Sequence, residues 1–329
     1  MDNIDYSVII RTTGNANEKY QKLLDSIAGL IPQPKEIIVV LPEGYGLPEQ
    51  RLGSETFLFC TKGMVRQRLK GIEACKTEYA LVCDDDVSFP ADFVRKLHEP
   101  IKKGLGSFSI APLYSFLPDN GINSLICMVM ASAVPTVIYR KTRYISVLKS
   151  TGYSYNRHLD RSHTHYYETQ SAAWTCFYTN VGTMRALEME KEIWLDSHGY
   201  SAMDDQTMFY KAWLMGLKTI VVSDAVYEHM DAKTSIQGNR SAVIYARSFN
   251  RVVFWHRFIY TQQNRWWGFI LSIIAFRYRL FWEGIRSRSS LLRKKMTWEE
   301  YLLQKNGIKD AYRYIQSEEY IQLPELIIE

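Results

Sequence analysis

The stretch Tyr79-Ala80-Leu81-Val82-Cys83-Asp84-Asp85-Asp86 sets five apolar or aromatic residues directly before three aspartates. The apolar run predicts a buried β-strand, with the aspartates at its carboxyl end, the edge where open α/β sheets bind ligands. An extended backbone would point Asp84 and Asp86 to one side and Asp85 to the other. Converging carboxylates favour a cation between them, and oxygen ligands suit Mg²⁺ or Mn²⁺. The alternative is a solvated acidic turn after the strand.

Periodic segments surround this stretch. Apolar runs at residues 6–10, 36–41 and 57–60 predict further strands, and apolar residues at helical spacing in 20–30 and 63–76 predict helices. Alternation of strands and helices predicts βαβ units and a mostly parallel sheet. Right-handed crossovers then bring the carboxyl ends of strands 6–10, 36–41 and 79–83 to one edge, around one ligand.

Bulk composition predicts a folded protein of the cytoplasm. The chain has 329 residues, 47% hydrophobic and 23% charged, which is enough to build a substantial core. Its five cysteines form no CxxC pair, so we expect reduced core residues. The acidic opening residues lead into a strand-like segment and do not fit a secretory signal.

The middle of the chain carries two ambiguous stretches. Residues 125–138 are apolar but contain Pro135 and are too short to span a bilayer, so we expect them in the core. Residues 151–170 contain His158, His163 and His165 among aromatic residues. This stretch is either a metal-binding cluster or a surface loop, which could also cover an acceptor.

A second acidic pair, Asp204-Asp205, precedes an amphipathic segment that ends at Gly216. The pair is therefore expected at a helix N-terminus. Aspartate there caps exposed N–H groups and complements the helix dipole, which is a purely structural explanation. Capping is compatible with catalysis, because a cap fixes the position of a carboxylate.

The C-terminal region is strongly basic and aromatic. Between Arg240 and Lys295 there are twelve Lys or Arg residues and a single acid, Glu283. Basic helices with Trp and Phe on one side lie on anionic membrane surfaces, so residues 240–295 are predicted to bind such a surface. The alternatives are packing on the rest of the chain and nucleic-acid binding, and we expect no nucleic-acid partner.

Taken in order, residues 5–235 resemble the family 2 glycosyltransferases with the GT-A fold. The opening strand of that family, of the type Val-Ile-Ile-Pro-Thr-x-Asn, corresponds to residues 8–15. Its Arg-Asn-x-Gly helix corresponds to Arg68-Leu69-Lys70-Gly71, and the acidic triplet follows at the spacing typical of the family. The later acidic pair corresponds to Asp204-Asp205, and a downstream metal-binding histidine to His229.

Three positions depart from the family pattern. Arg11 replaces the proline after the first strand, and Leu69 replaces the asparagine beside the helix arginine. The acid that ends the second strand and contacts the nucleoside is missing, and Glu43 is the substitute two residues further on. The last departure leaves the identity of the nucleotide open.

The resemblance implies a role for each matched residue. Asp86 and His229 are the expected ligands of Mn²⁺ or Mg²⁺, and Asp205 is the expected catalytic base, with Asp204 as its neighbour. Asp84 would face the ribose or a metal-bound water. The residues expected to bind the nucleotide-sugar donor are Thr12, Glu43, Arg68, Asp84 and Asp85.

The implied protein is a metal-dependent, inverting glycosyltransferase of the hexosyltransferase type. A UDP-sugar is the favoured donor, and the acceptor is a glycan or lipid-linked hydroxyl in cell-surface polysaccharide synthesis. We expect a cytoplasmic enzyme, peripheral on the inner face of the membrane. A nucleotidyltransferase is one alternative, although that class usually has a Gly-rich loop where this chain has a single glycine, Gly14. A non-catalytic glycan- or membrane-binding protein on the same fold is the other.

The expected fold is α/β, of the GT-A class. It has a Rossmann-like, mostly parallel central sheet flanked by helices and a helical basic C-terminal extension. The expected domains are 1–235 for the GT-A part, with a nucleotide-sugar half at 1–100 and an acceptor half at 101–235, and 236–329 for the basic aromatic helices.

Overall fold

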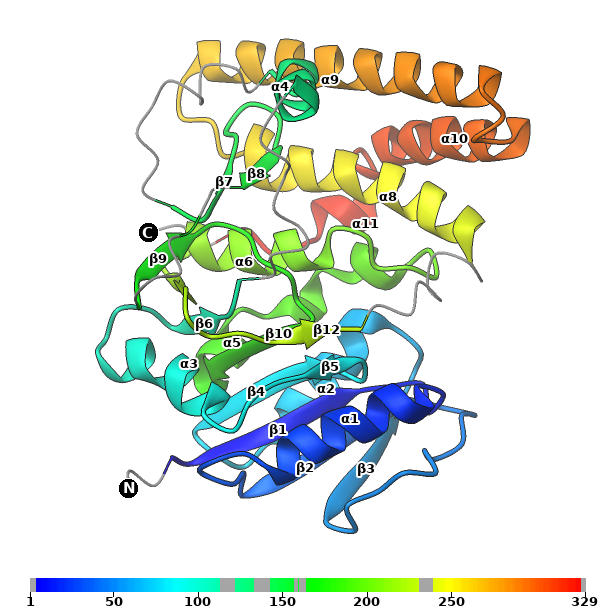
Figure 1. The fold of residues 1–329 in the computed structure, drawn as a ribbon. Helices are drawn as coiled ribbons and strands as arrows, with labels where there is room; N and C mark the ends of the chain where they lie inside the picture. Colours follow the sequence, from blue (N-terminus) through cyan, green and yellow to red (C-terminus); the bar gives the residue numbers. More distant parts are fainter. Residues whose placement is uncertain are drawn as a thin grey trace.

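The structure, a computed structural model, describes residues 4–112, 122–132, 143–156, 159, 164–230 and 239–326. A central sheet of eight strands has the order β3-β2-β1-β4-β10-β6-β11-β9 (Figure 1). In chain order these strands are β1 (Tyr6–Arg11), β2 (Glu36–Pro42), β3 (Glu55–Cys60), β4 (Tyr79–Asp84), β6 (Phe108–Ile110), β9 (Tyr166–Thr169), β10 (Cys176–Asn180) and β11 (Thr219–Val222). Strands β3, β2, β1 and β4 are mutually parallel, whereas β10 runs antiparallel to β4 and to β6.

Helices cover both faces of the sheet, because successive strand residues point to opposite sides. In β1, Val8 and Ile10 pack with α1 (Asn17–Ala28) and α3 (Phe93–Lys102), whereas Ile9 packs on the other face. That second face holds α2 (Met64–Ala74), α5 (Val181–Ala186) and α6 (Asp204–Leu214). The expected α/β class, with helices around a mostly parallel sheet, is confirmed.

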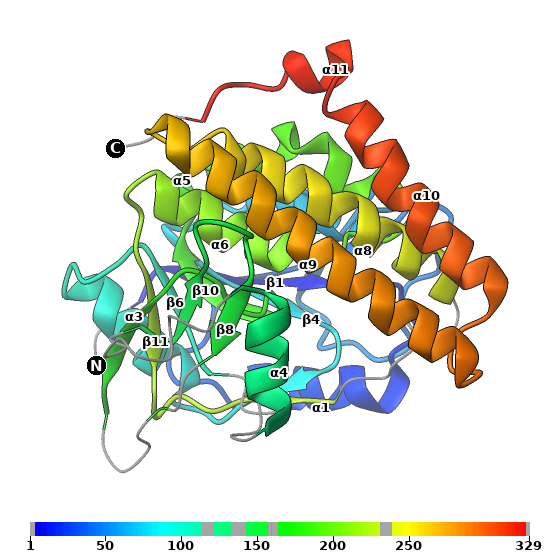
Figure 2. The ribbon, with the colours of Figure 1, turned by 90° about the horizontal axis from the view of Figure 1, so that it is seen from above.

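Shorter elements and the C-terminal helices complete the described chain. The short strands are β5 (Val87–Ser88), β7 (Ile145–Val147), β8 (Ser154–Asn156) and β12 (Glu228–His229). The remaining helical elements are α4 (Ile122–Met130), η3 (Met189–Lys191), η4 (Ile193–Asp196), α8 (Arg240–Trp255), the π-helical η5 (His256–Tyr260), α9 (Trp266–Leu292), α10 (Trp298–Tyr314) and α11 (Glu318–Ile321). Helix α8 lies between the sheet-bearing part and α9 (Figures 1 and 2).

A buried ion-pair network fastens the C-terminal helices to the rest of the chain. Glu192 accepts hydrogen bonds from Lys211 at 2.9 Å and from Arg257 at 2.7 and 3.0 Å. Burial alone would raise the pKa of Glu192, but the two cations outweigh burial and lower it. Phe249 and Val252 of α8 join the hydrophobic core on the α2 face of the sheet. The C-terminal helices therefore share a core with the sheet, and a domain boundary at 235 stays a prediction.

Of the two expectations for the middle of the chain, one needs correction and the other concerns residues that the structure does not describe. Residues 125–138 were expected in the core, but Leu125, Ile126 and Val129 of α4 are exposed, and residues 133–138 lie outside the described ranges. The reason is that α4 is an outer helix that turns Met128 inward, toward Leu148 and Tyr153. His158 and His163 also lie outside those ranges, so the histidine cluster stays a prediction.

The cysteines only partly match the expected core placement. Cys75, Cys83 and Cys176 are buried, Cys60 is half-buried and Cys127 of α4 is exposed, and all five are free thiols.

In the part of the chain that the structure describes, no helix combines the length and apolar character needed to cross a bilayer.

Helix α2 packs directly on β1 through a glycine. A Cβ atom added to Gly71 would meet Cγ2 of Ile9 closer than real Cβ atoms approach other atoms. We predict that Gly71→Ala destabilises the protein by about 1–3 kcal/mol, because the helix must move off the sheet. The matched control is Gly284→Ala in the interior of α9, where an added Cβ meets nothing within 4 Å.

Chemical denaturation of the two variants measures the difference. Gly284→Ala should be neutral or stabilising by up to ~1 kcal/mol, because alanine is the better helix former. Equal stability of both variants would contradict this close packing.

Candidate active site

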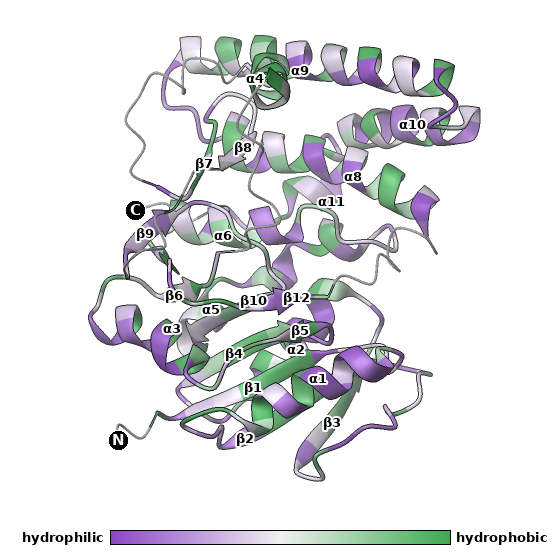
Figure 3. Ribbon diagram, viewed as in Figure 1, coloured by the Kyte–Doolittle hydropathy of each residue, from purple (hydrophilic) through white to green (hydrophobic). Residues whose placement is uncertain are grey.

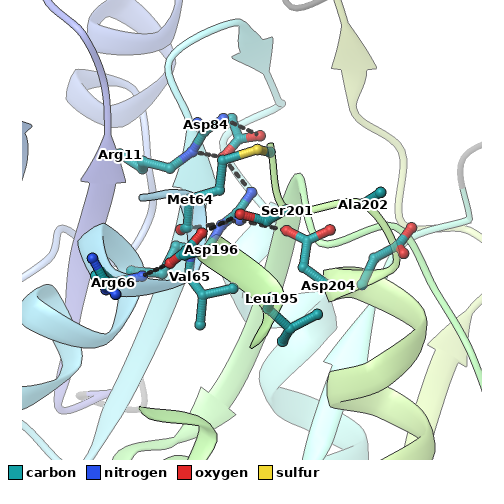
Figure 4. Close-up of polar contacts among 12 residues, drawn as sticks. Arg11, Met64, Val65, Arg66, Asp84, Leu195, Asp196, Ser201, Ala202 and Asp204 are labelled. Atoms are coloured by element: carbon teal, nitrogen blue, oxygen red, sulfur yellow. Dashed lines mark hydrogen bonds and ion pairs between the residues drawn. The ribbon is translucent and has the colours of Figure 1, made fainter. Parts of the chain in front are cut away.

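The carboxyl end of β4 carries a buried ion-pair cluster. Parallel pairing of β1 with β4 sets Arg11 opposite Asp84. Nε of Arg11 lies 2.9 Å from Oδ1 of Asp84, and Nη2 lies 2.9 Å from Oδ2, so the guanidinium holds both carboxylate oxygens (Figure 4). Asp84 is only 5% exposed. The replacement of the expected proline by Arg11 therefore supplies a charged partner for the first aspartate of the triplet.

Arg68 of α2 links this cluster to the second acidic pair. Its Nη2 lies 2.8 Å from Oδ1 of Asp84, and its Nη1 lies 3.2 Å from Oδ2 of Asp204. The side chain is 2% exposed, and its guanidinium carbon lies 4.8 Å from the ring centre of the buried Trp174. One buried cation thus joins two carboxylates that are far apart in sequence.

Two arginines keep Asp84 ionised. Burial alone would raise the pKa of Asp84, but Arg11 and Arg68 outweigh burial and hold the pKa below its ordinary value. Asp84 therefore remains a carboxylate, and both of its oxygens are engaged by guanidinium groups. This arrangement differs from the expectation that Asp84 and Asp86 converge on one cation, since β4 ends at Asp84 and the chain then turns.

Asp85 points to the β1 loop. Thr12 donates its hydroxyl to Oδ2 of Asp85 at 2.5 Å and accepts the N–H of Gly14 at 2.9 Å. Burial raises the pKa of Asp85 to about 6, against the opposing effects of Arg11 and of the Thr12 hydrogen bond. The structure therefore brings together two of the expected donor-binding residues, Thr12 and Asp85.

Asp86 and His229 come together through a two-stranded sheet. β5 pairs with β12, and the N–H of Met230 donates to the backbone oxygen of Asp86 at 2.8 Å. Nε2 of His229 lies 3.3 Å from Oδ1 of Asp86. That Oδ1 is buried and accepts no hydrogen bond, which is uncommon for a buried carboxylate oxygen. The pair expected to hold the metal is adjacent in space.

The Asp86–His229 pair fits a divalent cation as a two-ligand site. A carboxylate suits Mn²⁺ or Mg²⁺, and the imidazole shifts the preference toward Mn²⁺; such ions commonly complete their shell with water and substrate phosphates. Within the described residues, no group of three or more His, Cys, Asp or Glu side chains is arranged to hold a metal. The remaining ligands would thus have to come from substrate or solvent.

The two aspartates at the start of α6 differ in burial and in their partners. Asp204 is buried and bound to Arg68, whereas Asp205 is half-buried. Oδ1 of Asp205 accepts the N–H of Gln206 at 2.6 Å, and Gln206 itself donates to the backbone oxygen of Gly152 at 2.7 Å. The helix cap is Met203, in the left-handed conformation and without a side-chain bond, so neither aspartate is the N-cap residue.

Burial and mutual repulsion raise the pKa values of this pair. Burial raises the pKa of Asp204 despite Arg68, and the neighbouring Asp205 raises it further. Burial also raises the pKa of Asp205, against the hydrogen bond from Gln206. The pair therefore takes up a proton more readily than ordinary aspartates, as suits a general base that works near neutral pH.

Glu43 lies apart from the other candidates. It follows β2, two strands away from β4 in the sheet, and its side chain is exposed. Its N–H donates to the backbone oxygen of Cys60 at 2.9 Å. The structure places Glu43 at the same edge of the sheet but does not bring it into the carboxylate cluster.

Two contributors were not identified from the sequence as site residues. Asp196 accepts the N–H groups of Val65 at 3.4 Å and Arg66 at 3.0 Å, and it also accepts the hydroxyl of Ser201 (Figure 4). It thereby binds the N-terminus of α2, the helix that carries Arg68. Arg11 was noted only as a departure from the family pattern, although its position at the end of β1 beside Asp84 was a usable signal.

Comparison with known proteins identifies the fold and finds a family model that matches part of the chain. Residues 58–172 match the model of glycosyl transferase family 2. A crystal structure of S. aureus TarS 1–349 is 13% identical with a TM-score of 0.52, over 94% of this chain and 80% of that one. A longer TarS structure is 14% identical with a TM-score of 0.53, over 97% of this chain and 50% of that one.

A third structure belongs to a different protein, and a further comparison was negative. GalNAc-T7, crystallised with UDP, GalNAc and Mn²⁺, is 13% identical with a TM-score of 0.55, over 84% of this chain and 54% of that one. No curated protein sequence matches the chain significantly. At these identities the structural matches show the fold alone. The GT-A fold of these structures and the match of residues 58–172 to the family 2 model confirm the resemblance inferred from the sequence.

Proposed function

We propose that this chain is a metal-dependent, inverting hexosyltransferase that uses a nucleoside-diphosphate sugar, with a UDP-sugar as the favoured donor. The acceptor is a hydroxyl of a glycan or lipid-linked saccharide in cell-surface polysaccharide synthesis. One observation carries the proposal: Arg68 binds Asp84 on one side and Asp204 on the other. Arg68 thereby connects the carboxylate triplet with the acidic pair. The triplet would bind the donor, and the acidic pair would deprotonate the acceptor.

The reaction would be a direct displacement. The acceptor oxygen forms a bond to the anomeric carbon, the bond from that carbon to the diphosphate oxygen breaks, and the nucleoside diphosphate leaves with the bonding electrons. Asp205 takes the acceptor proton, because its carboxylate is the less buried of the pair. Asp204 and Arg68 hold the base in place. Attack opposite the leaving group inverts the anomeric centre.

A divalent cation is assigned to Asp86 and His229. Bound there, it would stabilise the negative charge that develops on the departing diphosphate. The buried Oδ1 of Asp86, which accepts no hydrogen bond and lies 3.3 Å from Nε2 of His229, supports this assignment, as does the Mn²⁺ in the GalNAc-T7 crystal. Thr12 and Asp85 lie at the same edge and would contact the nucleotide, while Arg11 and Arg68 hold both carboxylate oxygens of Asp84.

The basic C-terminal region supports a location on the inner face of a membrane. Residues 240–295 would bind its anionic surface, which also presents lipid-linked acceptors. This part of the proposal is independent of the chemistry at Asp205.

Calorimetric titration of the protein with UDP, GDP and their sugar derivatives tests donor binding. We expect one nucleotide to bind in the presence of Mn²⁺, and its affinity to fall at least about tenfold without metal or in Asp86→Ala. The matched control is Asp25→Ala, an exposed carboxylate on α1. Metal-independent binding that Asp86→Ala leaves unchanged would contradict the assigned metal pair, and absence of binding to every nucleotide would contradict the donor class.

A further inference from the structure

Helix α9 has an apolar outer face. From Trp267 to Ile285, exposed hydrophobic side chains recur every three or four residues, the spacing of one side of a helix. The large exposed hydrophobic side chains of α9 are Trp266, Trp267, Ile270, Leu271, Ile274, Tyr278, Phe281, Ile285 and Leu292. Ile274 is 60% exposed and Phe281 is 61% exposed. The hydropathy colouring of the uppermost helix in Figure 3 shows hydrophobic and hydrophilic positions alternating along its whole length.

The opposite face of α9 is fixed to the protein. Phe276 stacks on Trp255 of α8 with ring centres 4.2 Å apart, and Ser272 accepts the indole N–H of Trp255 at 3.0 Å. Arg279 donates to the backbone oxygen of Thr151 at 3.0 Å. The helix is therefore held firmly on one side, and its apolar outer face is a fixed feature of the fold.

Helix α4 extends the apolar surface. It lies against α9 (Figures 1 and 2). Its exposed hydrophobic side chains are Ile122, Leu125, Ile126 and Val129. These four residues and the nine of α9 are called the α4/α9 face below. More than half of the large exposed hydrophobic side chains among the described residues belong to it. Such a concentration on one side of a protein marks an interaction surface.

All exposed charged side chains of α9 and of the turns beside it are basic. The exposed charged residues from 265 to 295 are Arg265, Arg277, Arg286, Arg288, Arg293, Lys294 and Lys295. The single acid in this segment, Glu283, is paired with Arg251 and Arg279. An apolar stripe bordered by cations matches the boundary between acyl chains and anionic headgroups.

We propose that the α4/α9 face binds the surface of a bilayer that contains anionic lipids, with α9 parallel to the membrane plane. Aromatic and aliphatic side chains of the face enter the headgroup boundary, and the flanking arginines and lysines contact lipid phosphates. The 27 residues of α9 give a contact roughly 40 Å long. The inference deepens and rests on the proposed membrane association, since it assigns that association to α9 and adds α4.

A second copy of the chain fits this face less well. In a two-fold dimer the same patch meets itself, so the exposed cations of both copies would face each other without acids between them. A nucleic acid would satisfy the cations but would leave the row of isoleucine and leucine side chains uncovered. An anionic bilayer satisfies both the apolar and the basic residues.

Sedimentation with lipid vesicles tests the proposal. The full chain is mixed with vesicles of phosphatidylcholine alone or with about a quarter phosphatidylglycerol. We expect binding to the anionic vesicles only. The double variant Ile274→Glu with Phe281→Glu, and separately Leu125→Glu on α4, should each reduce the partition coefficient by about tenfold or more. The control Ile321→Glu, at a 71% exposed position of α11, should bind like the wild type.

Four outcomes would overturn parts of this account, and they are distinguishable. Absence of binding by the wild type overturns membrane association as a whole and leaves the transferase chemistry untouched. Binding that the α9 variant does not weaken overturns the assigned face, and binding that only Leu125→Glu leaves unchanged removes α4 from it. A dimer in light scattering that the α9 variant dissociates, together with no vesicle binding, identifies the face as an interface between copies.

Discussion

Replacing Asp205 with Asn is expected to lower the turnover number by about 10²–10⁴-fold, the usual contribution of a general base. The amide keeps the size of the side chain and its acceptor oxygen for the N–H of Gln206, but it cannot take a proton. Affinity for the nucleotide sugar should change little, because the proposal assigns Asp205 to the acceptor and not to the donor. Initial rates at saturating donor, compared with calorimetric donor affinity, measure the two effects separately.

The same variant should alter the pH profile. Because the pKa of the acidic pair is raised, part of the wild-type enzyme carries a protonated base at mildly acidic pH, and the rate should rise as pH increases through that range. An ordinary aspartate would pass the midpoint of this rise near pH 4 and complete it by about pH 6. Asp25→Asn on α1 serves as the matched control and should keep the profile. A turnover number in Asp205→Asn within about threefold of the wild type would remove Asp205 from the base role.

Replacing Arg68 with Met is expected to destabilise the protein by about 3–5 kcal/mol, the usual cost of breaking a buried ion pair on one side. Methionine fills much of the same space beside Trp174 but leaves Asp204 without its cation. Asp84 retains Arg11. The free energy of unfolding, from chemical denaturation, measures the loss. Arg66→Met is the control, since Arg66 lies on the same helix with an exposed side chain.

A double-mutant cycle assigns the loss to the ion pair. In an Asp204→Asn background residue 204 already carries a neutral amide. Arg68→Met should therefore lower the free energy of unfolding by about 0.5–3 kcal/mol less than it does in the wild type. Equal costs in both backgrounds would show that Arg68 stabilises the fold through Asp84 and Trp174 rather than through Asp204, and the link between the two acidic groups would lose its energetic basis.

The sequence predicted the elements that depend on local pattern. The apolar run before Asp84 is long enough to specify a buried strand, and the edge of a parallel sheet then brings Thr12, Asp85 and the triplet together. The pairing of Asp86 with His229 was expected only through the family resemblance. It is brought about by the short β5 and β12 strands, which carry almost no periodic signal of their own.

The partners of charged side chains were less predictable. Arg68 contacts residues 16 and 136 positions away, so its ion pairs depend on how α2 and α6 pack on the sheet. Arg11 was treated as a departure, yet it neutralises Asp84. The apolar composition of α4 led to the prediction that it lies in the core, which was wrong. Composition alone does not distinguish an inner helix from one on an outer surface.

The most direct test of the central claim is phosphorus NMR of a panel of nucleotide sugars incubated with the protein, Mn²⁺ and a mixture of glycan acceptors. The account predicts that one donor is consumed with release of nucleoside diphosphate, and that Asp205→Asn slows this release at least about a hundredfold. Cleavage to nucleoside monophosphate, or consumption of no donor at all, would contradict a glycosyl transfer site built on Asp84, Arg68 and the acidic pair.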